Sequence, residues 1–455
     1  MTCYIDASIP SGNGRRITLL GTDLIFASID NVFVYPTLNV DRLRNALSET
    51  LSIWPILTGR IIVNCDEYMI ECSDNSIPFN YTENNELECW PDLPVVVDDK
   101  TILEPFIDSV QYKIEVEPLL RFKVTYLLRS KEYIVGTSTS HLVGDAYSNI
   151  RFLNDLSQIY QHLEPLPPRP IFQRCLLNKE KLDLSFPLIK EISEKAEKIE
   201  SFFGRFIKGK SETEQINLSF SSEQLIRLQS IGKCDDEEVT IHDTLCAYII
   251  ITLNKYFFLT TDEHIQRARM IINYRGICDS LVTQEHVGNY IISIPSSQFT
   301  DSLSLPSTAK IIRQAIKTIR NEDFLEKWLV SADVLTRQLI KDGRVNYILD
   351  QNEVIFNSNF KYDWANEVNL GMINQCRFHT AVSFKFYFRI FQLNPIKGKD
   401  GRWTKDNGGA QVAVRIPKGE RKDKFLEAWT KDIQENFATV TPLETTGFRR
   451  HHGSS

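Results

Sequence analysis

Residues 135–150 read VGTSTSHLVGDAYSNI, and this stretch decides the fold that the sequence predicts. It opens with the valine, threonine and small polar residues of a strand, and apolar residues at helical spacing continue after it at Leu153 and Leu156. His141 and Asp145 therefore lie where a predicted strand passes into a predicted helix. Such junctions often carry chemistry, because rigid elements on both sides position the side chains of the loop.

The HxxxD spacing of His141 and Asp145 is by itself a weak indicator of catalysis. The chain contains eight histidines, so an aspartate four residues after one of them is unsurprising by chance. Taken from the residues alone, His141 is either a general base or a polar residue that ends a strand, and Asp145 either orients the imidazole or serves the structure. A neutral imidazole, with an unperturbed pKa near ~6.5, is the side chain best suited to remove a proton at cellular pH.

The composition is that of a globular protein with more than one core. The chain has 455 residues, of which 42% are hydrophobic and 24% are charged, and this length exceeds what one hydrophobic core usually serves. The net charge is −7 and the basic residues are scattered, which argues against a nucleic-acid surface. No apolar run approaches the ~20 residues of a membrane span, and the first residues lack the basic-then-apolar order of a signal peptide.

The cysteines and histidines predict neither a disulfide framework nor a metal site. The nine cysteines form no CxxC pair and are too sparse for a disulfide scaffold, so we expect them to be reduced and the protein to be cytoplasmic. Four histidines lack the spacing to cysteine or carboxylate that metal sites show: His242, His264, His286 and His379. The sequence also has no Walker or dinucleotide glycine pattern, and we expect no metal and no permanently bound cofactor.

The pattern of elements divides the chain into two halves of mixed helices and strands. We expect an N-terminal domain at residues 1–187, a crossover linker helix at 188–214 and a C-terminal domain at 215–455. Within the linker, apolar residues recur every three or four positions, which predicts one helix whose apolar face lies either on the protein core or on a membrane surface. Its polar face mixes Lys with Glu, which favours the protein core. A second, strongly apolar helix is predicted after Thr240, a good N-cap with Asp243 in the capping-box position.

HLVGDAYS at residues 141–148 and four further parts of the chain resemble the motifs of one known family, in the same order. The further parts are LSETLSIWPILTGRI (47–61), VTIHDTLCAYI (239–249), INYRG (272–276) with VGNY (287–290), and GGAQVAVRIPKGERKDKFLEAW (408–429). The family that they resemble is the BAHD acyltransferases, which use acyl-CoA. HLVGDAYS is similar to the HxxxDG signature of that family. The other parts are similar, in order, to its early helix with a P-x-x-G-R turn, the start of its second half, its N-x-R and G-N pattern, and its closing strand and helix.

The resemblance implies a mixed α/β fold of two similar chloramphenicol acetyltransferase-like domains with a tunnel at their interface. Acyl-CoA, the co-substrate, would enter the tunnel from one face and a small-molecule acceptor from the other. The implied reaction is direct transfer of the acyl group to a hydroxyl or an amine of a specialised metabolite, by a monomer and without a covalent acyl-enzyme. A hydroxyl is favoured because an alcohol stays protonated at neutral pH and gains most from a base.

The resemblance also implies roles for three residues around the motif. His141 would be the general base. Asp145 would point away from the tunnel and pair with Arg275 of INYRG, so that a buried ion pair holds the His141 loop in place. This assignment makes Asp145 and Arg275 structural residues at the active site, in contrast to the triad alternative.

Five further residues are candidates for contacts with the substrates. Thr240, at a helix N-terminus that could receive a CoA phosphate, either contacts the ligand or caps only its own helix. By resemblance, Leu370 and Gly371 line the pantetheine path through backbone groups. Ser358 and Asn359 precede that segment and are either donors to the developing oxyanion or residues of a turn.

Two departures from the family pattern leave other functions open. The second signature of the family, DFGWG, falls at NLGMI (369–373), where only Gly371 is kept, and Ala146 stands where HxxxDG has glycine. One alternative is a condensation-type enzyme that uses carrier-bound acyl groups, although such enzymes usually have HHxxxDG and Ser140 precedes His141 here. The other alternative is a non-catalytic family member that acts as an accessory protein.

Overall fold

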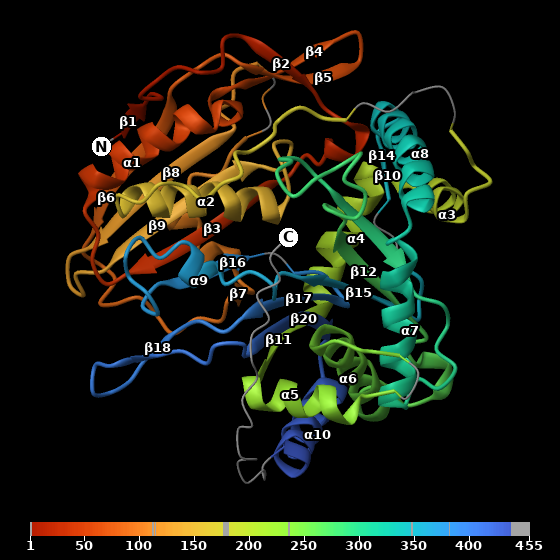
Figure 1. The fold of residues 1–455 in the computed structure, drawn as a ribbon. Helices are drawn as coiled ribbons and strands as arrows, with labels where there is room; N and C mark the ends of the chain where they lie inside the picture. The colour runs from red at the N-terminus through yellow and green to blue at the C-terminus, as the bar shows by residue number, and fades with distance from the viewer. Residues whose placement is uncertain are drawn as a thin grey trace.

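The computed structural model has the mixed α/β architecture that the sequence predicts, with two sheet-rich parts (Figure 1). It describes residues 2–111, 113, 115–175, 182–234, 237–346, 349–381 and 383–437. The first large sheet contains, in spatial order, β1 (Thr2–Ile5), β6 (Ile77–Asn84), β8 (Leu120–Leu127), β9 (Tyr133–Ser140), β3 (Ser28–Tyr35), β16 (Arg377–Ala381) and β7 (Val96–Val97). The second contains β11 (Thr213–Phe220), β20 (Ala410–Pro417), β17 (Tyr387–Gln392), β15 (Glu353–Ser358), β12 (Arg267–Asn273) and β13 (Ile291–Pro295).

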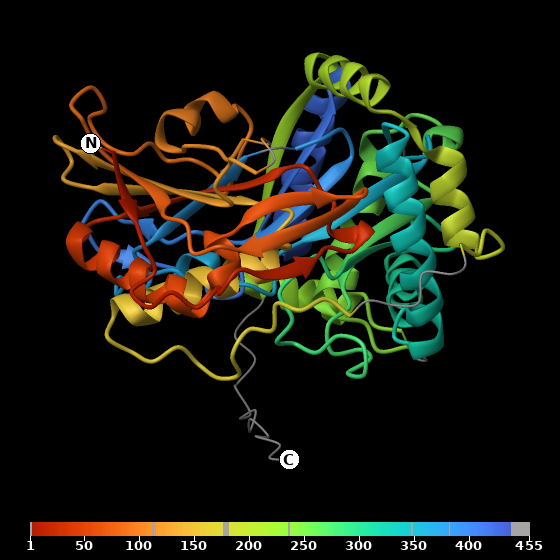
Figure 2. The ribbon, with the colours of Figure 1, turned by 90° about the horizontal axis from the view of Figure 1, so that it is seen from above.

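Two helices, α1 (Val40–Ile53) and α2 (Ala146–Tyr160), pack against each other and cover one face of the first sheet (Figure 2). α1 begins after Asn39, whose side chain accepts a hydrogen bond from the Arg42 N–H (3.0 Å). It ends just before Pro55, which cannot continue a helix. The apolar faces of both helices and the facing side of the sheet share one buried core, so α2 is held rigidly where it follows β9.

The second sheet packs against α6 (Ile241–Tyr256), which is buried along most of its length. The helix is apolar on nearly all sides because it lies between the sheet and other helices. The predicted capping box at its start is confirmed: Thr240 Oγ1 accepts from the Asp243 N–H, and the Asp243 carboxylate accepts from the Thr240 N–H. The helices that pack against α6 include α5 (Ser222–Ile231), α7 (Leu305–Thr318) and α10 (Glu420–Phe437).

One strand joins the two halves of the chain. β16 lies in the last quarter of the sequence, yet it pairs with β3 and β7 of the first sheet. Before it, the short helix α9 (Trp364–Glu367) contacts α2. The expected domain boundaries at residues 187 and 215 stay predictions, and a division made by sheets would assign residues 377–381 to the first half.

The linker between the halves contains two helices where one was predicted. α3 (Pro187–Lys195) ends at Ala196, whose φ of −66° and ψ of 133° are those of extended backbone. β10 (Glu197–Lys198) then pairs with β14 (Arg344–Val345), and α4 (Ile199–Glu212) follows. Apolar residues recur at helical spacing on both sides of the break, so the sequence gives no sign of it. The helix is interrupted by the pairing of β10 with β14, a strand almost 150 residues further along the chain.

The apolar side of α4 also lies differently from the expectation. None of its residues is fully buried, and Phe203 and Ile207 are 52% and 68% exposed. Contact between the rings of Phe206 and Phe384, with centroids 5.0 Å apart, attaches α4 to the protein. Among the described residues, no helix has both the length and the apolar character that crossing a bilayer would require.

Candidate active site

His141 lies at the junction between β9 and α2, the strand-to-helix transition that the sequence predicts. Its backbone N–H donates to the carbonyl of Ala27 (2.8 Å), next to the pairing of β9 with β3. Asp145 is the N-cap of α2 and accepts a hydrogen bond from the Ser148 N–H (3.0 Å). The loop of residues 141–144 is therefore fixed at both of its ends.

The imidazole of His141 is oriented by Asn289, a buried residue of the VGNY segment. The Asn289 Nδ2 donates to the carbonyls of His141 (2.6 Å) and Asp23 (3.2 Å), which fixes the amide with Oδ1 facing the ring. Oδ1 lies 2.9 Å from His141 Nδ1. Because an amide oxygen can only accept, Nδ1 carries the proton, and Nε2 keeps an unprotonated lone pair.

The surroundings of His141 favour its neutral form. Burial lowers the pKa of its imidazole below the ordinary value, and this effect exceeds the opposing influence of the Asp145 carboxylate and of the hydrogen bond with Asn289. Within the described residues, no side chain forms a hydrogen bond with Nε2. A neutral ring with a free Nε2 has the protonation state that a general base requires.

The Asp145 carboxylate pairs with Arg275 and makes no hydrogen bond with His141. Arg275 donates from Nη1 to Asp145 Oδ2 (2.8 Å) and from Nη2 to Oδ1 (3.1 Å), and both side chains are almost completely buried. The Tyr290 N–H donates to Oδ2 as well (3.1 Å). Burial raises the pKa of the Asp145 carboxyl, but Arg275 and the bonds from the Ser148 and Tyr290 N–H groups overcome this and hold it below its ordinary value.

This pair, which we call the Asp145–Arg275 clamp, joins the His141 loop to the second half of the chain. Arg275 also donates to the carbonyls of His286 (2.8 Å) and Gly288 (2.7 Å), just before Asn289. The clamp therefore also fixes the backbone on which Asn289, the residue that orients His141, is carried. In a triad, a carboxylate would occupy the position at His141 Nδ1 that Asn289 holds here.

A second buried ion pair supports Asn289 from the other side, and sequence reasoning missed it. Arg174 Nε donates to Asp23 Oδ2 (2.9 Å), and both side chains are at most 1% exposed. Asp23 Oδ1 accepts the Asn289 N–H (2.9 Å), and Arg174 donates to the Val143 carbonyl in the His141 loop (3.0 Å). No motif marks Asp23 or Arg174. Asn289 belongs to the VGNY segment (287–290), and its place in that segment is the one sequence feature that could have indicated a role for it.

Leu370 and Gly371, two of the residues expected to contact CoA, lie by the end of α2 that is far from the His141 loop. Leu370 is buried, and its N–H donates to Ser157 Oγ (3.1 Å), near the C-terminal end of α2. Ser157 is twelve residues beyond Asp145, which corresponds to about 18 Å along the helix axis. Gly371 has a φ of +86°, which favours glycine, and its N–H donates to Asn369 Oδ1 (2.7 Å).

Thr240, the third residue expected to contact CoA, has both functions of its hydroxyl in use. Its Oγ1 donates to the Asp243 carboxylate (2.8 Å) and accepts from the Asp243 N–H (3.3 Å). The side chain therefore caps its own helix in the structure. The first turn of α6 still presents its N–H groups and the positive end of the helix dipole in the direction of Thr240.

Ser358 and Asn359 lie near the clamp. β15 runs parallel to β12, with Asn357 opposite Ile271, so the ends of both strands reach the same edge of the second sheet. Asn359 is 5% exposed, and its carbonyl accepts the Tyr362 N–H (3.0 Å). The Tyr362 hydroxyl in turn accepts a hydrogen bond from Asn273 (3.4 Å), the residue that follows along β12 toward Arg275.

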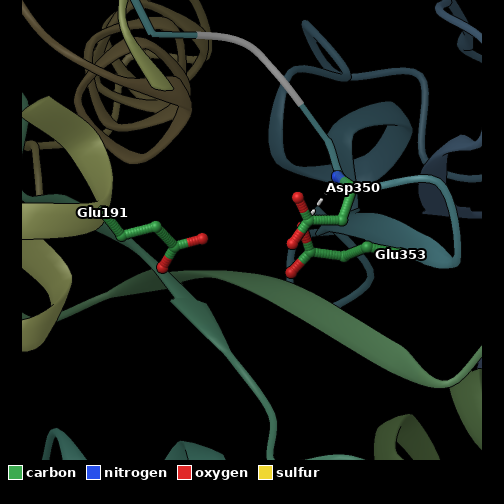
Figure 3. A group of neighbouring side chains, drawn as sticks. All are labelled: Glu191, Asp350 and Glu353. Atoms are coloured by element: carbon green, nitrogen blue, oxygen red, sulfur yellow. Dashed lines mark hydrogen bonds between the residues drawn. The ribbon is translucent and has the colours of Figure 1, made fainter. Parts of the chain in front are cut away.

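Three carboxylates outside this region come together, as Figure 3 shows for Glu191 of α3 and Asp350 and Glu353 at the start of β15. Their oxygens lie within 4.8 Å of one another. Lys195 contacts both Glu191 and Asp350 at 2.8 Å, and Arg269 contacts Glu353 at 3.3 Å and Glu191. With Arg267, whose Nη1 lies 3.7 Å from Asp350, three side-chain cations compensate the three carboxylates, so the group is an ion-pair network that ties α3 to the second sheet.

The family to which the chain belongs follows from comparison with known proteins. The family model described as "Transferase family" matches residues 22–376, which is more than half of the chain. The chain therefore belongs to this family, the BAHD acyltransferases, as the sequence resemblance indicated. No curated protein matches the sequence.

Solved structures of family members share the fold over more than nine-tenths of this chain. F. sporotrichioides TRI101 complexed with coenzyme A and T-2 is 14% identical, with a TM-score of 0.66 over 92% of this chain and 98% of that one. Vinorine synthase is 16% identical, with a TM-score of 0.58 over 92% and 94%. F. graminearum TRI101 complexed with ethyl coenzyme A is 12% identical, with a TM-score of 0.64 over 95% and 99%. At these identities the likeness shows the fold, which confirms the two-part chloramphenicol acetyltransferase-like prediction.

Proposed function

We propose that the chain transfers an acyl group from acyl-CoA to the hydroxyl of a small-molecule acceptor, with His141 as the general base. Membership of the BAHD acyltransferases supports the reaction class, and the coenzyme A complexes of TRI101 support acyl-CoA as the donor. The observation that carries the proposal is the hydrogen bond from His141 Nδ1 to Asn289, which leaves a neutral ring with its Nε2 lone pair available.

In the proposed step, His141 Nε2 removes the proton of the acceptor hydroxyl while the hydroxyl oxygen attacks the carbonyl carbon of the thioester. A C–O bond forms, and the carbonyl electrons move onto the oxygen of a tetrahedral intermediate. When the intermediate collapses, the C–S bond breaks and the imidazolium gives its proton to the CoA thiolate. His141 returns to its neutral form, and no covalent acyl-enzyme is formed.

Four further residues are assigned to support this step. We assign Asp145 and Arg275 to holding the His141 loop, because the clamp joins that loop to the segment that carries Asn289. Ser358 and Asn359 are assigned to donate hydrogen bonds to the oxyanion, where a donor aimed at the developing charge lowers the barrier. The burial of Asn359 at the edge of the second sheet next to the clamp supports this assignment.

Contacts with CoA are assigned to Thr240, Leu370 and Gly371. At Thr240, the N–H groups of the first turn of α6 would face a phosphate of the ligand. The N–H groups of Leu370 and Gly371 are already bonded within the protein, so their carbonyls are the groups left to contact pantetheine.

The acceptor and the setting are proposed on chemical grounds. An alcohol stays protonated at neutral pH and gains more from a base than an amine does, so we propose O-acylation of a specialised metabolite. The acceptor and acyl-CoA would meet in a tunnel between the two halves of a monomer. All nine cysteines are free thiols, which supports a reducing, cytoplasmic setting.

The experiment that tests this function measures thiol release from a panel of acyl-CoAs mixed with hydroxylated acceptors, together with the mass of the acylated product. We expect thiol release that depends on an acceptor in the wild type and is lost in His141→Ala. His162→Ala, which changes an exposed histidine, is the matched control and should keep the wild-type rate.

Each other outcome identifies a different function. Transfer only from a carrier-bound thioester would favour the condensation-type alternative. No transfer from any donor would favour the accessory protein. A His141→Ala enzyme as fast as the wild type would remove His141 from the chemistry and leave the family membership intact.

A further inference from the structure

The helix α4 of the linker carries an apolar stripe that the rest of the protein leaves exposed. Ile199, Phe203 and Ile207 are spaced four residues apart and therefore lie along one side of the helix. Their exposed fractions are 38%, 52% and 68%. The apolar spacing in the sequence is compatible with a place on the protein core or on a membrane surface, and these three side chains do not lie on the core.

α4 is attached to the protein immediately beside this stripe. Phe206 is half-buried, and its ring contacts that of Phe384. Figure 2 shows α4, in yellow-green, at the outer edge of the molecule, where the chain continues into β11. Because Phe206 directly precedes Ile207 and lies three residues after Phe203, the protein itself occupies one flank of the stripe. The stripe is open to a broad surface but not to a groove that would enclose the helix.

The size of the stripe distinguishes a lipid surface from a second protein chain. A stable protein–protein interface uses about 20–30 residues on each side. The stripe has three, and its members are followed by Glu200, Gly204 and Lys208, which are exposed and carry no apolar side chain. A lipid surface makes a smaller demand, because an interfacial helix sinks its apolar side chains only about 5–10 Å into the boundary of headgroups and acyl chains.

The charges around the stripe favour an anionic lipid surface. The segment 198–212 contains four cationic side chains and two carboxylates, whereas the whole chain has a net charge of −7. Lys210 lies three residues after Ile207, hence on the same side of α4. Lys198 stands next to Ile199 at the other end of the stripe, and both lysines are exposed. Anionic phosphates would therefore meet cations at both ends of the inserted side chains.

The nearby carboxylates leave these cations available. Glu212 lies 3.8 Å from Lys208, and both side chains are more than half exposed, so water screens the pair and it is weak. Hydrogen bonds from Thr101 lower the pKa of the exposed Asp99 carboxyl, and Lys210 contributes least to that shift. A lipid phosphate can replace surface contacts of this kind.

We propose that α4 docks the protein onto a membrane surface that contains anionic phospholipid. The apolar stripe enters the boundary between headgroups and acyl chains, and the exposed lysines of α4 contact the phosphates. The helix lies along the surface and does not cross it. This role goes beyond the proposed acyl transfer and does not depend on it, because no residue of the stripe takes part in the contacts around His141.

Co-sedimentation of the full-length protein with vesicles tests this proposal. One set of vesicles contains phosphatidylcholine with about 30% phosphatidylserine, and a second set contains phosphatidylcholine alone. We expect the wild type to bind the anionic vesicles, and the Phe203→Ser Ile207→Ser double variant to bind them at least about tenfold more weakly, because it inserts less apolar surface. Ile226→Ser is the matched control: it removes an isoleucine that is 62% exposed on α5, and binding should stay unchanged.

A pair of lysine variants tests the part that charge plays. Lys208 and Lys431 are 75% and 74% exposed, and each has a glutamate four residues later, at 3.8 Å and 3.6 Å. Lys208→Gln should weaken binding to the anionic vesicles several-fold, whereas Lys431→Gln on α10 should not change it. Added salt should weaken binding as well, since it screens the phosphates.

Three results would overturn the proposal. One is a wild type that does not bind the anionic vesicles or that binds both sets equally. Another is equal binding of the wild type and the double variant. The third is a wild-type dimer that the double variant fails to form, measured by light scattering without vesicles, because a second copy would then cover the stripe. Thermal unfolding shows whether each variant is folded; if the double variant is not, Ile207→Ser, at the most exposed position of the stripe, decides the question.

Discussion

His141 and His379 are two histidines of the same half of the molecule in different hydrogen-bonding situations. His379, on β16, is 1% exposed, and both of its ring nitrogens are engaged. The Trp90 Nε1–H donates to its Nε2 (3.1 Å), and its Nδ1 lies 2.9 Å from the Pro94 carbonyl. His141 has one engaged nitrogen, Nδ1 with Asn289, and its Nε2 forms no hydrogen bond within the described residues.

The difference teaches that burial does not separate a functional histidine from a structural one. Burial lowers the pKa of both rings, so both are neutral at pH 7. In His379, the two hydrogen bonds use the whole polar capacity of the neutral ring. In His141, the second nitrogen is left over for a substrate. Burial therefore does not tell the two residues apart, whereas the motif around His141 and the hydrogen-bond partners of each ring do.

The largest effect that tests this comparison is expected when each histidine is replaced by glutamine and the turnover and stability of the two variants are compared. His141→Gln should lower kcat by about 10²- to 10⁴-fold, because general-base catalysis contributes about that much, and should leave the melting temperature unchanged. His379→Gln should lower the melting temperature and leave kcat unchanged, since it disturbs two buried hydrogen bonds and no reacting group. Steady-state kinetics and thermal unfolding of the two variants check both halves of the prediction.

The second prediction concerns the clamp. Asp145→Asn should destabilise the fold by about 3 to 5 kcal/mol, because it leaves the Arg275 charge buried without its partner. Asp41→Asn is the matched control: its carboxylate is 86% exposed and pairs with Arg44 at 2.8 Å, so its loss should cost less than about 1 kcal/mol. Urea unfolding measures both values. A normally stable Asp145→Asn protein with collapsed activity would favour the triad instead.

The third prediction uses pH to separate the roles of the two rings. Burial lowers the pKa of His379 to about 4, whereas in the unfolded chain it is near ~6.5. Below that value the unfolded state takes up a proton that the folded state refuses. Stability is therefore full above about pH 6.5 and falls by about 3 kcal/mol as the pH drops toward 4. Unfolding at a series of pH values should show this loss in the wild type and a smaller one in His379→Gln.

The fourth and smallest effect is expected for Asn289→Ala, which removes the group that orients His141. A hydrogen bond to the imidazolium that His141 becomes in the proposed step contributes about 1.5 to 3 kcal/mol, so kcat should fall by about 10- to 100-fold. The hydrogen bond with Asn289 raises the pKa of His141, so its loss should move the acid limb of the pH–rate profile to lower pH. A loss of activity with an unmoved limb would mean that Asn289 serves folding only.

The parts of the fold that depend on neighbouring residues could be predicted from the sequence. The passage from strand to helix around His141 follows from the change in apolar spacing, and the capping box at Thr240 follows from the residue types three positions apart. Both features are decided within a few residues, where spacing and hydrogen-bonding capacity are visible in the printed sequence.

The parts decided by distant contacts could not be predicted in this way. Asn289 is 148 residues from His141, and nothing in the spacing of either residue indicates that their side chains meet. Asp23 and Arg174 are likewise brought together only by assembly of the two halves. The break at Ala196 has the same origin, because the distant strand β14 ends the helix while the apolar spacing continues.

The most direct test of the central claim is the protonation state of the His141 ring in solution. A long-range ¹H–¹⁵N correlation spectrum of ¹⁵N-histidine-labelled protein, with the His141 signals assigned by their absence in His141→Gln, distinguishes the two nitrogens. At pH 7 the account predicts a neutral ring with the proton on Nδ1 and a bare Nε2, and a pKa below about 6.5. A ring protonated on Nε2, or an imidazolium at pH 7, would contradict it.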